Sequence, residues 1–188
     1  MVQPVCAFKI QIQVAHESLR NKADVIQCAA TNMANPTRTY IMNHIEETLV
    51  LIKPDALERG LAGEIIRRFE AAGLRIHNVR WVSPSLAMVE KHYADLKSKN
   101  PRAFDRNTRY LAKKNALALV LAGISAIAKV RMLIGPTEPV TAPPGTIRCD
   151  LSSDTIKFAD SQDRGLYNLV HAADSADSAR REIELWFE

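Results

Sequence analysis

The stretch TLVLIKP, residues 48 to 54, decides the fold that we predict for this chain. Its first five residues form an apolar run typical of a buried β-strand, and Pro54 ends the strand because proline cannot donate to a sheet ladder. A helix is predicted directly after it, with an apolar stripe on one side, charged residues on the other and Gly73 at its end. The stripe consists of Leu61, Ile65, Ile66 and Phe69.

The same sequence of strand and helix signals recurs to the end of the chain. The segment 76–82 alternates apolar and polar residues, which predicts a half-buried strand, and 116–123 and 166–173 are predicted as two more strands. We expect helices at 85–96 and 101–111, one through Leu133, and a last helix with an apolar stripe. That stripe comprises Ala176, Ala179, Ile183, Trp186 and Phe187; a long rigid loop is marked by Gly135, Pro136, Pro139, Pro143, Pro144 and Gly145.

The order of these elements predicts the fold class. Strands alternate with helices, and some connections hold two helices. This indicates an α+β protein, an α/β sandwich of the ferredoxin-like βαββαβ type, with a four-stranded antiparallel sheet and helices packed on it.

Residues 1–46 differ from the regular sequence that begins at Glu47. They are polar and weakly patterned, apart from FKIQIQV at residues 8–14, whose alternation could form an edge strand. We expect an N-terminal extension, or sequence upstream of a true start at Met42, followed by one domain over residues 47–188. The acidic and polar residues of this segment argue against a transit peptide or a secretory signal.

The composition is that of a soluble globular protein, with 47% hydrophobic and 24% charged residues. The longest apolar stretch, Ala116–Ala128, is too short to span a bilayer, so no membrane association is expected. Three widely spaced cysteines match no metal-binding pattern and indicate thiols in a reducing compartment, so we expect a cytoplasmic protein. The net charge of +4 is spread along the chain, which indicates no specific nucleic acid and suits small anionic ligands.

Three cations lie at the boundaries of predicted elements: Lys53, Arg131 and Arg148. Each alone has an ordinary explanation, such as a solvated charge or a cation that braces a loop. Together with Thr137 and Asn168 they form the set that a polyphosphate needs, with fixed cations to balance charge and neutral donors to orient oxygens. The sequence contains neither a P-loop nor a dinucleotide-binding glycine pattern.

The stretch NLVHAADS, residues 168 to 175, places His171 at the end of an apolar run and beside small residues. Because the ordinary pKa of histidine lies near neutrality, a neutral ring nitrogen is available to attack a phosphorus atom. The other ring nitrogen must then be held, and Glu182 on the last helix could reach it. A histidine without chemistry is the more common case for an isolated residue.

Five blocks of sequence, in order, resemble the nucleoside diphosphate kinase family over residues 47–188. They are ETLVLIKPDALERGLAGEIIRRFEAAGL, HYADL, RMLIGPTEP, PGTIRCD and NLVHAADS with EIELWF. The resemblance implies ping-pong phosphoryl transfer: a nucleoside triphosphate such as ATP gives its γ-phosphate to His171, and the phosphohistidine passes it to a nucleoside diphosphate. It also implies a homo-oligomer, either a tetramer or a hexamer.

The resemblance assigns roles to individual positions. Glu182 orients His171, Tyr93 lies beside that histidine, and Lys53 contacts ribose and phosphate. Phe104 is the candidate that stacks on the base, which would tolerate purines, pyrimidines, ribose and deoxyribose. The nucleotide-binding set is Lys53, Phe104, Arg131, Thr137, Arg148 and Asn168.

The resemblance implies Mg²⁺ as the cofactor. No cluster of carboxylates offers a resident site in the sequence, so we expect the ion to arrive bound to the nucleotide phosphates. Asp174 could touch it through water.

This sequence departs from the family pattern at three places. Ala173 replaces a usual serine, AKKNALAL (residues 112–119) replaces a Ser-Gly-Pro run, and additional residues separate Arg148 from Asn168, as in archaeal and some bacterial members. Ala173 supports an alternative hypothesis, a non-catalytic nucleotide-binding or regulatory protein on the same fold. A nucleic-acid-binding module on this fold would require exposed aromatic residues on the sheet, and the predicted strands are mostly aliphatic.

Overall fold

The structure, a computed structural model, describes residues 45–188. The edge strand expected at residues 8–14 and the possible start at Met42 lie outside the described residues. Within the described part, no helix combines the length and the apolar character that crossing a membrane requires.

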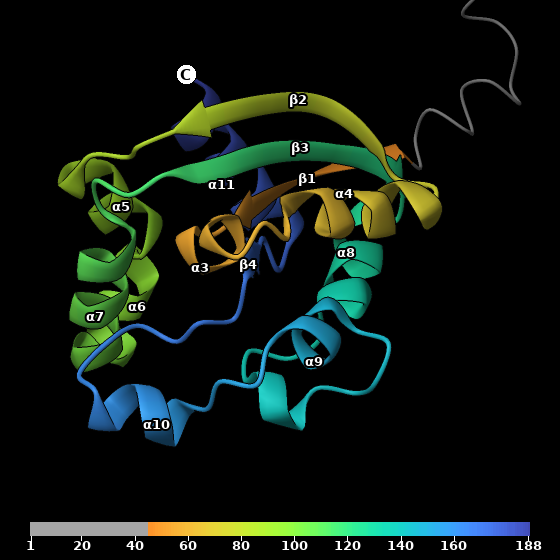
Figure 1. Cartoon of the computed structure of the whole chain (residues 1–188). Helices are drawn as coiled ribbons and strands as arrows, with labels where there is room; N and C mark the ends of the chain where they lie inside the picture. The colour runs from red at the N-terminus through yellow and green to blue at the C-terminus, as the bar shows by residue number, and fades with distance from the viewer. Residues whose placement is uncertain (1–44) are drawn as a thin grey trace, which may run out of the picture. The chain divides into compact units, whose positions relative to one another are not determined.

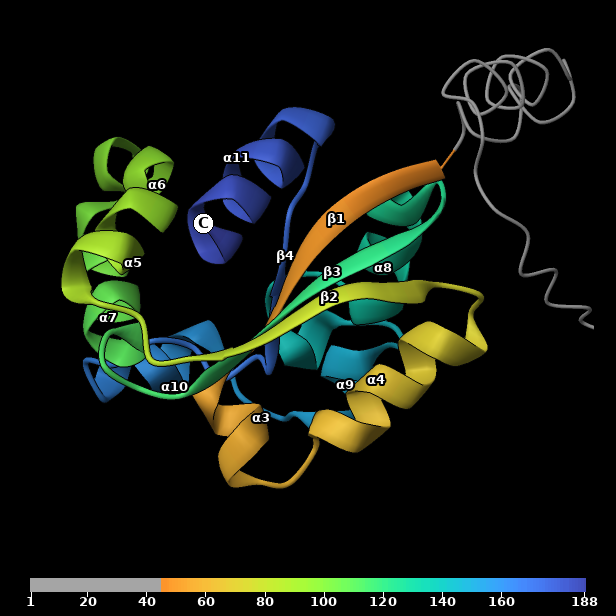
Figure 2. The same cartoon turned by 90° about the horizontal axis from the view of Figure 1, so that it is seen from above.

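A four-stranded antiparallel sheet in the order β2-β3-β1-β4 organises the fold (Figures 1 and 2). β1 pairs with β3 along its whole length and with β4 over three residues. The predicted ferredoxin-like α+β fold is therefore confirmed. The strands are β1 (Ile45–Ile52), β2 (Arg75–Val82), β3 (Ala116–Ile124) and β4 (Val170–Ala172).

Helices follow each strand, and side-chain caps define where several of them begin. The side chains of Ser85, Asn100 and Ser175 each accept a hydrogen bond from a backbone N–H in the first turn of the helix that follows. The helices are α3 (Pro54–Glu58), α4 (Ala62–Ala71), α5 (Leu86–His92), α6 (Ala94–Lys99), α7 (Pro101–Leu111), α8 (Ala126–Ile134), the 3₁₀-helix η1 (Pro139–Thr141), α9 (Ile147–Leu151), α10 (Ile156–Ser161) and α11 (Ala176–Phe187).

Each face of the sheet is covered by its own hydrophobic core. Val50 and Ile52 of β1 face a core shared with α4 and α8, whereas Leu49 and Leu51 face a second core with α5 and α11. Figure 2 shows these helices on opposite sides of the sheet. In β4, Val170 and Ala172 belong to the first core. Because side chains alternate along a strand, the residue between them points to the other face.

Four predictions about the elements need correction. The predicted helix 85–96 is broken at Tyr93 into α5 and α6. β2 is a strand, but its side chains are largely exposed because it lies at the edge of the sheet, with a bulge between Ile76 and Asn78. The predicted strand 166–173 is regular only over β4, because the backbone turns sharply at Leu169. On α11 the buried residues are Ala179, Glu182 and Trp186, so a carboxylate occupies part of the predicted apolar stripe.

Candidate active site

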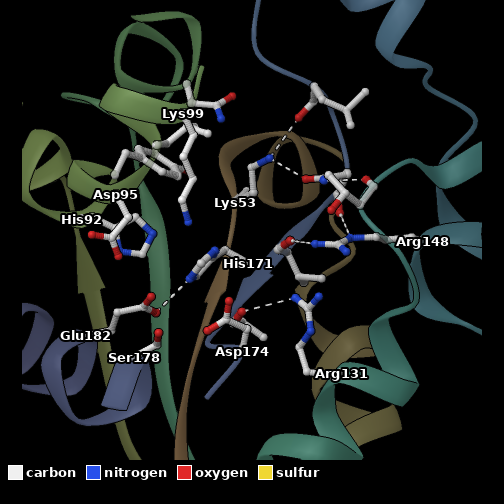
Figure 3. A pocket seen from close by; sticks show the side chains of 18 of the residues that line it. Lys53, His92, Asp95, Lys99, Arg131, Arg148, His171, Asp174, Ser178 and Glu182 are labelled. Atoms are coloured by element: carbon white, nitrogen blue, oxygen red, sulfur yellow. Dashed lines mark hydrogen bonds and ion pairs between the residues drawn. The ribbon is translucent and has the colours of Figure 1, made fainter. Parts of the chain in front are cut away.

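A cavity of about 410 Å³ opens between β4, α8, α9, α11 and the α5–α7 helices. It gathers nine of the ten side chains that the sequence indicated, from segments distant along the chain. Figure 3 shows most of them converging on one space. The nine are Lys53, Tyr93, Arg131, Thr137, Arg148, Asn168, His171, Asp174 and Glu182.

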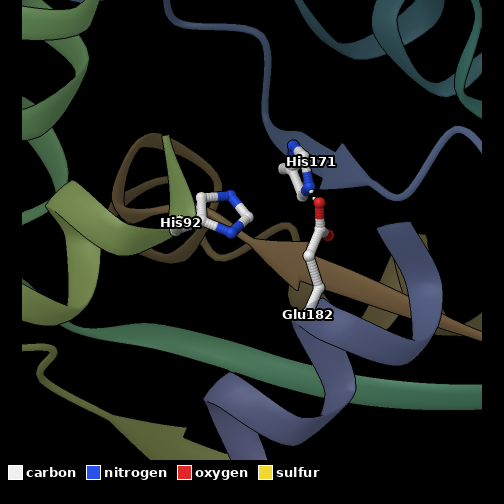
Figure 4. A group of neighbouring side chains, drawn as sticks. All are labelled: His92, His171 and Glu182. Carbon is white, nitrogen blue, oxygen red and sulfur yellow. Dashed lines mark hydrogen bonds and ion pairs between the residues drawn. The ribbon is translucent and has the colours of Figure 1, made fainter. Parts of the chain in front are cut away.

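His171 occupies the middle of β4, where it pairs with Leu51 of β1. Its Nε2 lies 2.8 Å from Oε2 of Glu182, a residue of α11 that is 5% exposed (Figures 3 and 4). No group among residues 45–188 bonds to Nδ1. An ionised Glu182 accepts the Nε2–H hydrogen bond, so it selects the tautomer in which Nδ1 keeps its lone pair.

The surroundings of His171 keep its ring neutral. Burial, followed by the charges of Lys53, Arg148 and Arg131, holds the pKa of His171 well below its usual range. Burial also raises the pKa of Glu182. A neutral imidazole held at Nε2 is a nucleophile that needs no base to remove a proton from Nδ1.

Arg148 is the most firmly held of the three cations. The sequence suggested a loop, but Arg148 lies on α9 and is 4% exposed. Its guanidinium donates to the backbone carbonyls of Gly135 at 2.8 Å, Asn168 at 3.2 Å and Val170 at 2.7 Å. The arginine therefore links the chain before and after the turn at Leu169 to the end of α8.

Lys53 and Asn168 form a second buried group. The Lys53 ammonium donates to Oδ1 of Asn168 at 2.7 Å and to the carbonyl of Leu166 at 2.9 Å. The Asn168 amide donates in turn to the carbonyl of Thr137 at 2.8 Å. Burial lowers the pKa of Lys53 to about 8, so the ammonium is still the main form at pH 7. The structure thus does not support a solvated lysine at the strand end.

Arg131 differs from both groups because it is only half-buried. Its one hydrogen bond in the described chain runs to the carbonyl of Ala172 at 3.5 Å. Asp174 lines the cavity nearby, and the neighbouring Ser178 hydroxyl lowers the pKa of its carboxyl. The Arg131 guanidinium is therefore free to bind an anion in the cavity.

The backbone turn before His171 is strained. The Val170 N–H donates to the Asn168 carbonyl at 2.7 Å, which closes a three-residue turn around Leu169, and the φ of Leu169 is +68°. A γ-turn with positive φ is a rare form. A left-handed conformation costs a residue with a side chain about 1–2 kcal/mol. Contacts elsewhere must hold this turn in place.

Comparisons with known proteins identify the family to which this site belongs. The family model described as nucleoside diphosphate kinase matches residues 46–188. The nucleoside diphosphate kinase of Caldanaerobacter subterraneus is 42% identical over 146 residues, which cover 78% of this chain and 96% of that protein. The chain belongs to the nucleoside diphosphate kinase family. It is therefore a phosphotransferase that acts on nucleoside di- and triphosphates.

Two further family members extend this likeness. The nucleoside diphosphate kinase of Pyrococcus furiosus is 43% identical over 147 residues, which are 78% of this chain and 86% of that one. A solved structure described as a transition state mimic of the kinase from Borrelia burgdorferi, with bound vanadate and ADP, is 32% identical. It has a TM-score of 0.75 and covers 77% of this chain and 88% of that chain.

Phe104 is the one predicted site residue of this kinase that does not line the cavity. It is half-buried on α7, with the Lys97 ammonium 5.4 Å from its ring centre. α7 contributes Asn107 to the cavity instead, one turn further along the helix. Stacking of Phe104 on the base stays a prediction.

His92 is a site residue that the sequence analysis missed. Its ring packs edge-to-face against that of His171, with centroids 4.4 Å apart. Tyr93, the residue expected beside that histidine, lines the same cavity. Its Nδ1 accepts a hydrogen bond from the Trp186 indole at 3.2 Å, and burial lowers the pKa of His92 to about 3. The HYADL block contained the signal, because His92 precedes the tyrosine that was singled out.

His92, His171 and Glu182 also form a group of potential metal ligands, with ligand atoms within 4.8 Å of one another (Figure 4). Because Nδ1 of His92 already accepts from Trp186, the proton of the neutral ring lies on Nε2, which then has no lone pair for a metal. Glu182 is engaged with His171. The group therefore offers no complete set of free lone pairs for a metal ion, although the Nε2 of His92 has no hydrogen-bond partner within residues 45–188.

Proposed function

We propose that His171 is the nucleophile of a ping-pong kinase and that its Nδ1 carries the phosphoryl group between nucleotides. In the first half-reaction, the Nδ1 lone pair forms a bond to the γ-phosphorus and the bond from that phosphorus to the β,γ-bridging oxygen breaks, which releases a nucleoside diphosphate. In the second, an oxygen of the terminal phosphate of another diphosphate attacks the same phosphorus and the P–N bond breaks.

The observation that carries this proposal is the 2.8 Å contact between His171 Nε2 and Glu182 Oε2. It leaves Nδ1 as the free nitrogen in a cavity lined by cations. As Nδ1 bonds to phosphorus the ring gains positive charge, and an ionised Glu182 stabilises that charge.

The three cations suit a triphosphate chain. Arg131, Arg148 and Lys53 line one side of the cavity, and the hydrogen bonds of Arg148 and Lys53 fix their positions before a ligand enters. Fixed charges need no reorganisation during transfer, which is the main way in which proteins catalyse phosphoryl transfer. We assign phosphate contacts to Arg131, Arg148 and Thr137, and ribose and phosphate contacts to Lys53 and Asn168.

We propose that Mg²⁺ enters with the nucleotide. Of the carboxylates that line the cavity, Glu182 is engaged with His171, and Asp95 pairs with Arg181 at 2.9 Å. Asp174 remains as the group that could hold a hydrated ion. When bound to the phosphates, Mg²⁺ supplies charge neutralisation.

We also propose that the enzyme is a cytoplasmic homo-oligomer. Val79 and Trp81 on the edge strand β2 are 54% and 62% exposed, and within residues 45–188 no strand pairs with the outer side of β2. Neighbouring apolar side chains on such an edge favour contact with another copy. Cys149 is a free thiol, as a reducing compartment would permit. Light scattering on the purified protein would show a mass of four or six chains, and a monomer would contradict the proposal.

The test is formation of a phosphoenzyme. The protein is incubated with γ-labelled ATP and Mg²⁺ without acceptor, and then chased with GDP or dCDP. We expect an acid-labile, base-stable label that moves into the acceptor and is absent from His171→Asn. If ATP binds but no label forms, the alternative of a non-catalytic nucleotide-binding protein would replace the proposal, with Ala173 as the first residue to restore to serine.

A further inference from the structure

Asp55 is a buried acid outside the cavity, and the sequence analysis gave it no role. Its side chain lies just after β1, at the start of α3, and the residue is 5% exposed. Oδ2 accepts a hydrogen bond from the Leu169 N–H at 3.0 Å. Oδ1 accepts from the Tyr110 hydroxyl at 2.6 Å, and that hydroxyl accepts from the Asp55 N–H at 2.9 Å. Each carboxylate oxygen is therefore engaged.

The Leu169 N–H belongs to the strained turn before the nucleophile. Leu169 has a φ of +68°, and its carbonyl accepts from the Lys53 N–H at 2.8 Å. Both backbone groups of Leu169 are thus hydrogen-bonded to the chain just after β1: its N–H to the Asp55 carboxylate and its carbonyl to the Lys53 N–H. His171 lies two residues after Leu169, and Asn168 is the first residue of the turn.

We propose that Asp55 is a positioning residue for phosphoryl transfer, whose carboxylate holds Leu169 in its positive-φ turn and thereby aims His171 and Asn168 into the cavity. The proposal rests on the proposed function of His171. Asp55 does not line the cavity, so it acts through the backbone and not by touching the nucleotide.

A role for Asp55 as the counter-ion of Lys53 fits the structure less well. Burial lowers the pKa of Lys53 and the charge of Asp55 raises it, but the Lys53 ammonium donates to Asn168 and Leu166, and no ion pair within residues 45–188 joins it to Asp55. A carboxylate that served charge balance alone would not need the direct bond to the Leu169 amide.

The experiment measures the single-turnover rate of phosphoenzyme formation and the dissociation constant of ATP in Asp55 variants of the full chain. We expect Asp55→Ala to slow transfer about 30-fold with the dissociation constant nearly unchanged, because misplacing a reacting group by about 1 Å costs on the order of 100-fold. Asp55→Asn keeps an oxygen that can accept from Leu169 and should retain most of the rate.

Two backgrounds separate positioning from a general loss of stability. Leu169→Ala and Leu169→Gly both remove the same buried side chain, but only glycine adopts a positive φ without a steric cost. Asp55→Ala should slow transfer about 30-fold in the alanine background and less than about threefold in the glycine background. An equal effect in both backgrounds would overturn the proposal.

If neither Leu169 variant folds, amide hydrogen exchange decides the question in Asp55→Ala alone. Protection should fall at Leu169 and Val170 and persist at Val50 and Leu51 of β1. A uniform loss of protection would show that Asp55 supports the fold and not the turn. A wild-type chain that forms no phosphoenzyme would refute the proposed function instead, so the two failures are distinguishable.

Discussion

The two sides of the active-site cavity are held in different ways. We call one side the cation wall; it consists of Lys53, Arg131, Arg148 and Asn168. All of these except Arg131 are buried and hydrogen-bonded to backbone carbonyls or to each other. The opposite helical wall, formed by α5, α6 and α7, presents Asp95 and Lys99 as exposed side chains. The chemistry therefore lies on a preorganised surface, whereas the facing surface is free to adapt to a ligand.

Arg148→Met should break the cation wall and have the largest effect. It removes the Arg148 donors from three carbonyls, of which that of Asn168 keeps the Val170 N–H. We therefore expect the free energy of unfolding to fall by about 3 kcal/mol and phosphoryl transfer to become undetectable. Urea denaturation and the coupled kinase assay measure the two quantities. An unchanged unfolding midpoint would show that the wall does not depend on these bonds.

Arg131→Met should separate activity from stability within the same wall. Arg131 is half-buried and has one long hydrogen bond, so its loss should change the unfolding free energy by less than about 1 kcal/mol. Loss of a phosphate-binding cation should lower kcat/KM by about 100-fold. Arg180→Met serves as the control, because the Arg180 side chain is exposed and does not line the cavity; a similar loss there would contradict the assignment.

The pH dependence should follow Glu182. Burial raises the pKa of Glu182 to about 7, while the pKa of His171 is depressed, so the ring stays neutral across this range. A protonated Glu182 would donate to Nε2 and move the ring proton to Nδ1. The rate of phosphoenzyme formation should therefore fall as the pH drops through about 7.

Glu182→Gln provides the control for this profile. The amide oxygen accepts from Nε2 at every pH, so the acidic fall should disappear, while the rate at pH 8 should be about tenfold lower because the negative charge is lost. A variant that keeps the acidic fall would assign it to another group.

Phe104→Ala should have the smallest effect and tests the helical wall. Because Phe104 lies outside the cavity, the KM for ATP should change less than about twofold if the wall keeps its present position. A rise of fivefold or more, measured against Lys97→Ala as the control for its neighbour, would show that α7 moves when the base binds.

The sequence predicted the cation wall better than the helical wall for a physical reason. Lys53, Arg131 and Arg148 carry charges, and the residue type itself indicates an anion. Only Lys53 lies between two elements as expected, because Arg131 is within α8 and Arg148 is within α9. His92 of the helical wall, and Asp55 outside the cavity, are instead set by ring packing and buried hydrogen bonds, which depend on partners distant in the sequence. The positive φ of Leu169 was equally invisible, because leucine gives no sign of the left-handed turn that glycine would have indicated.

The overall topology was predictable because strand and helix periods recur along the chain. The exposure of β2 was not, since alternation in the sequence does not say whether a strand lies at an edge. The short helices α9 and α10 were missed because each has fewer than two full turns in which to show a pattern.

The brevity of β4 has a consequence for how the protein tolerates changes in chain length. With only three ladder pairs, β4 has little resistance to slippage along β1. A shift by one position would exchange the two faces of the strand, so that Val170 or Ala172 would enter the cavity and the imidazole of His171 would enter the aliphatic core. Deletion of Tyr167, which does not line the cavity, would thus keep every proposed site residue and still produce an inert protein.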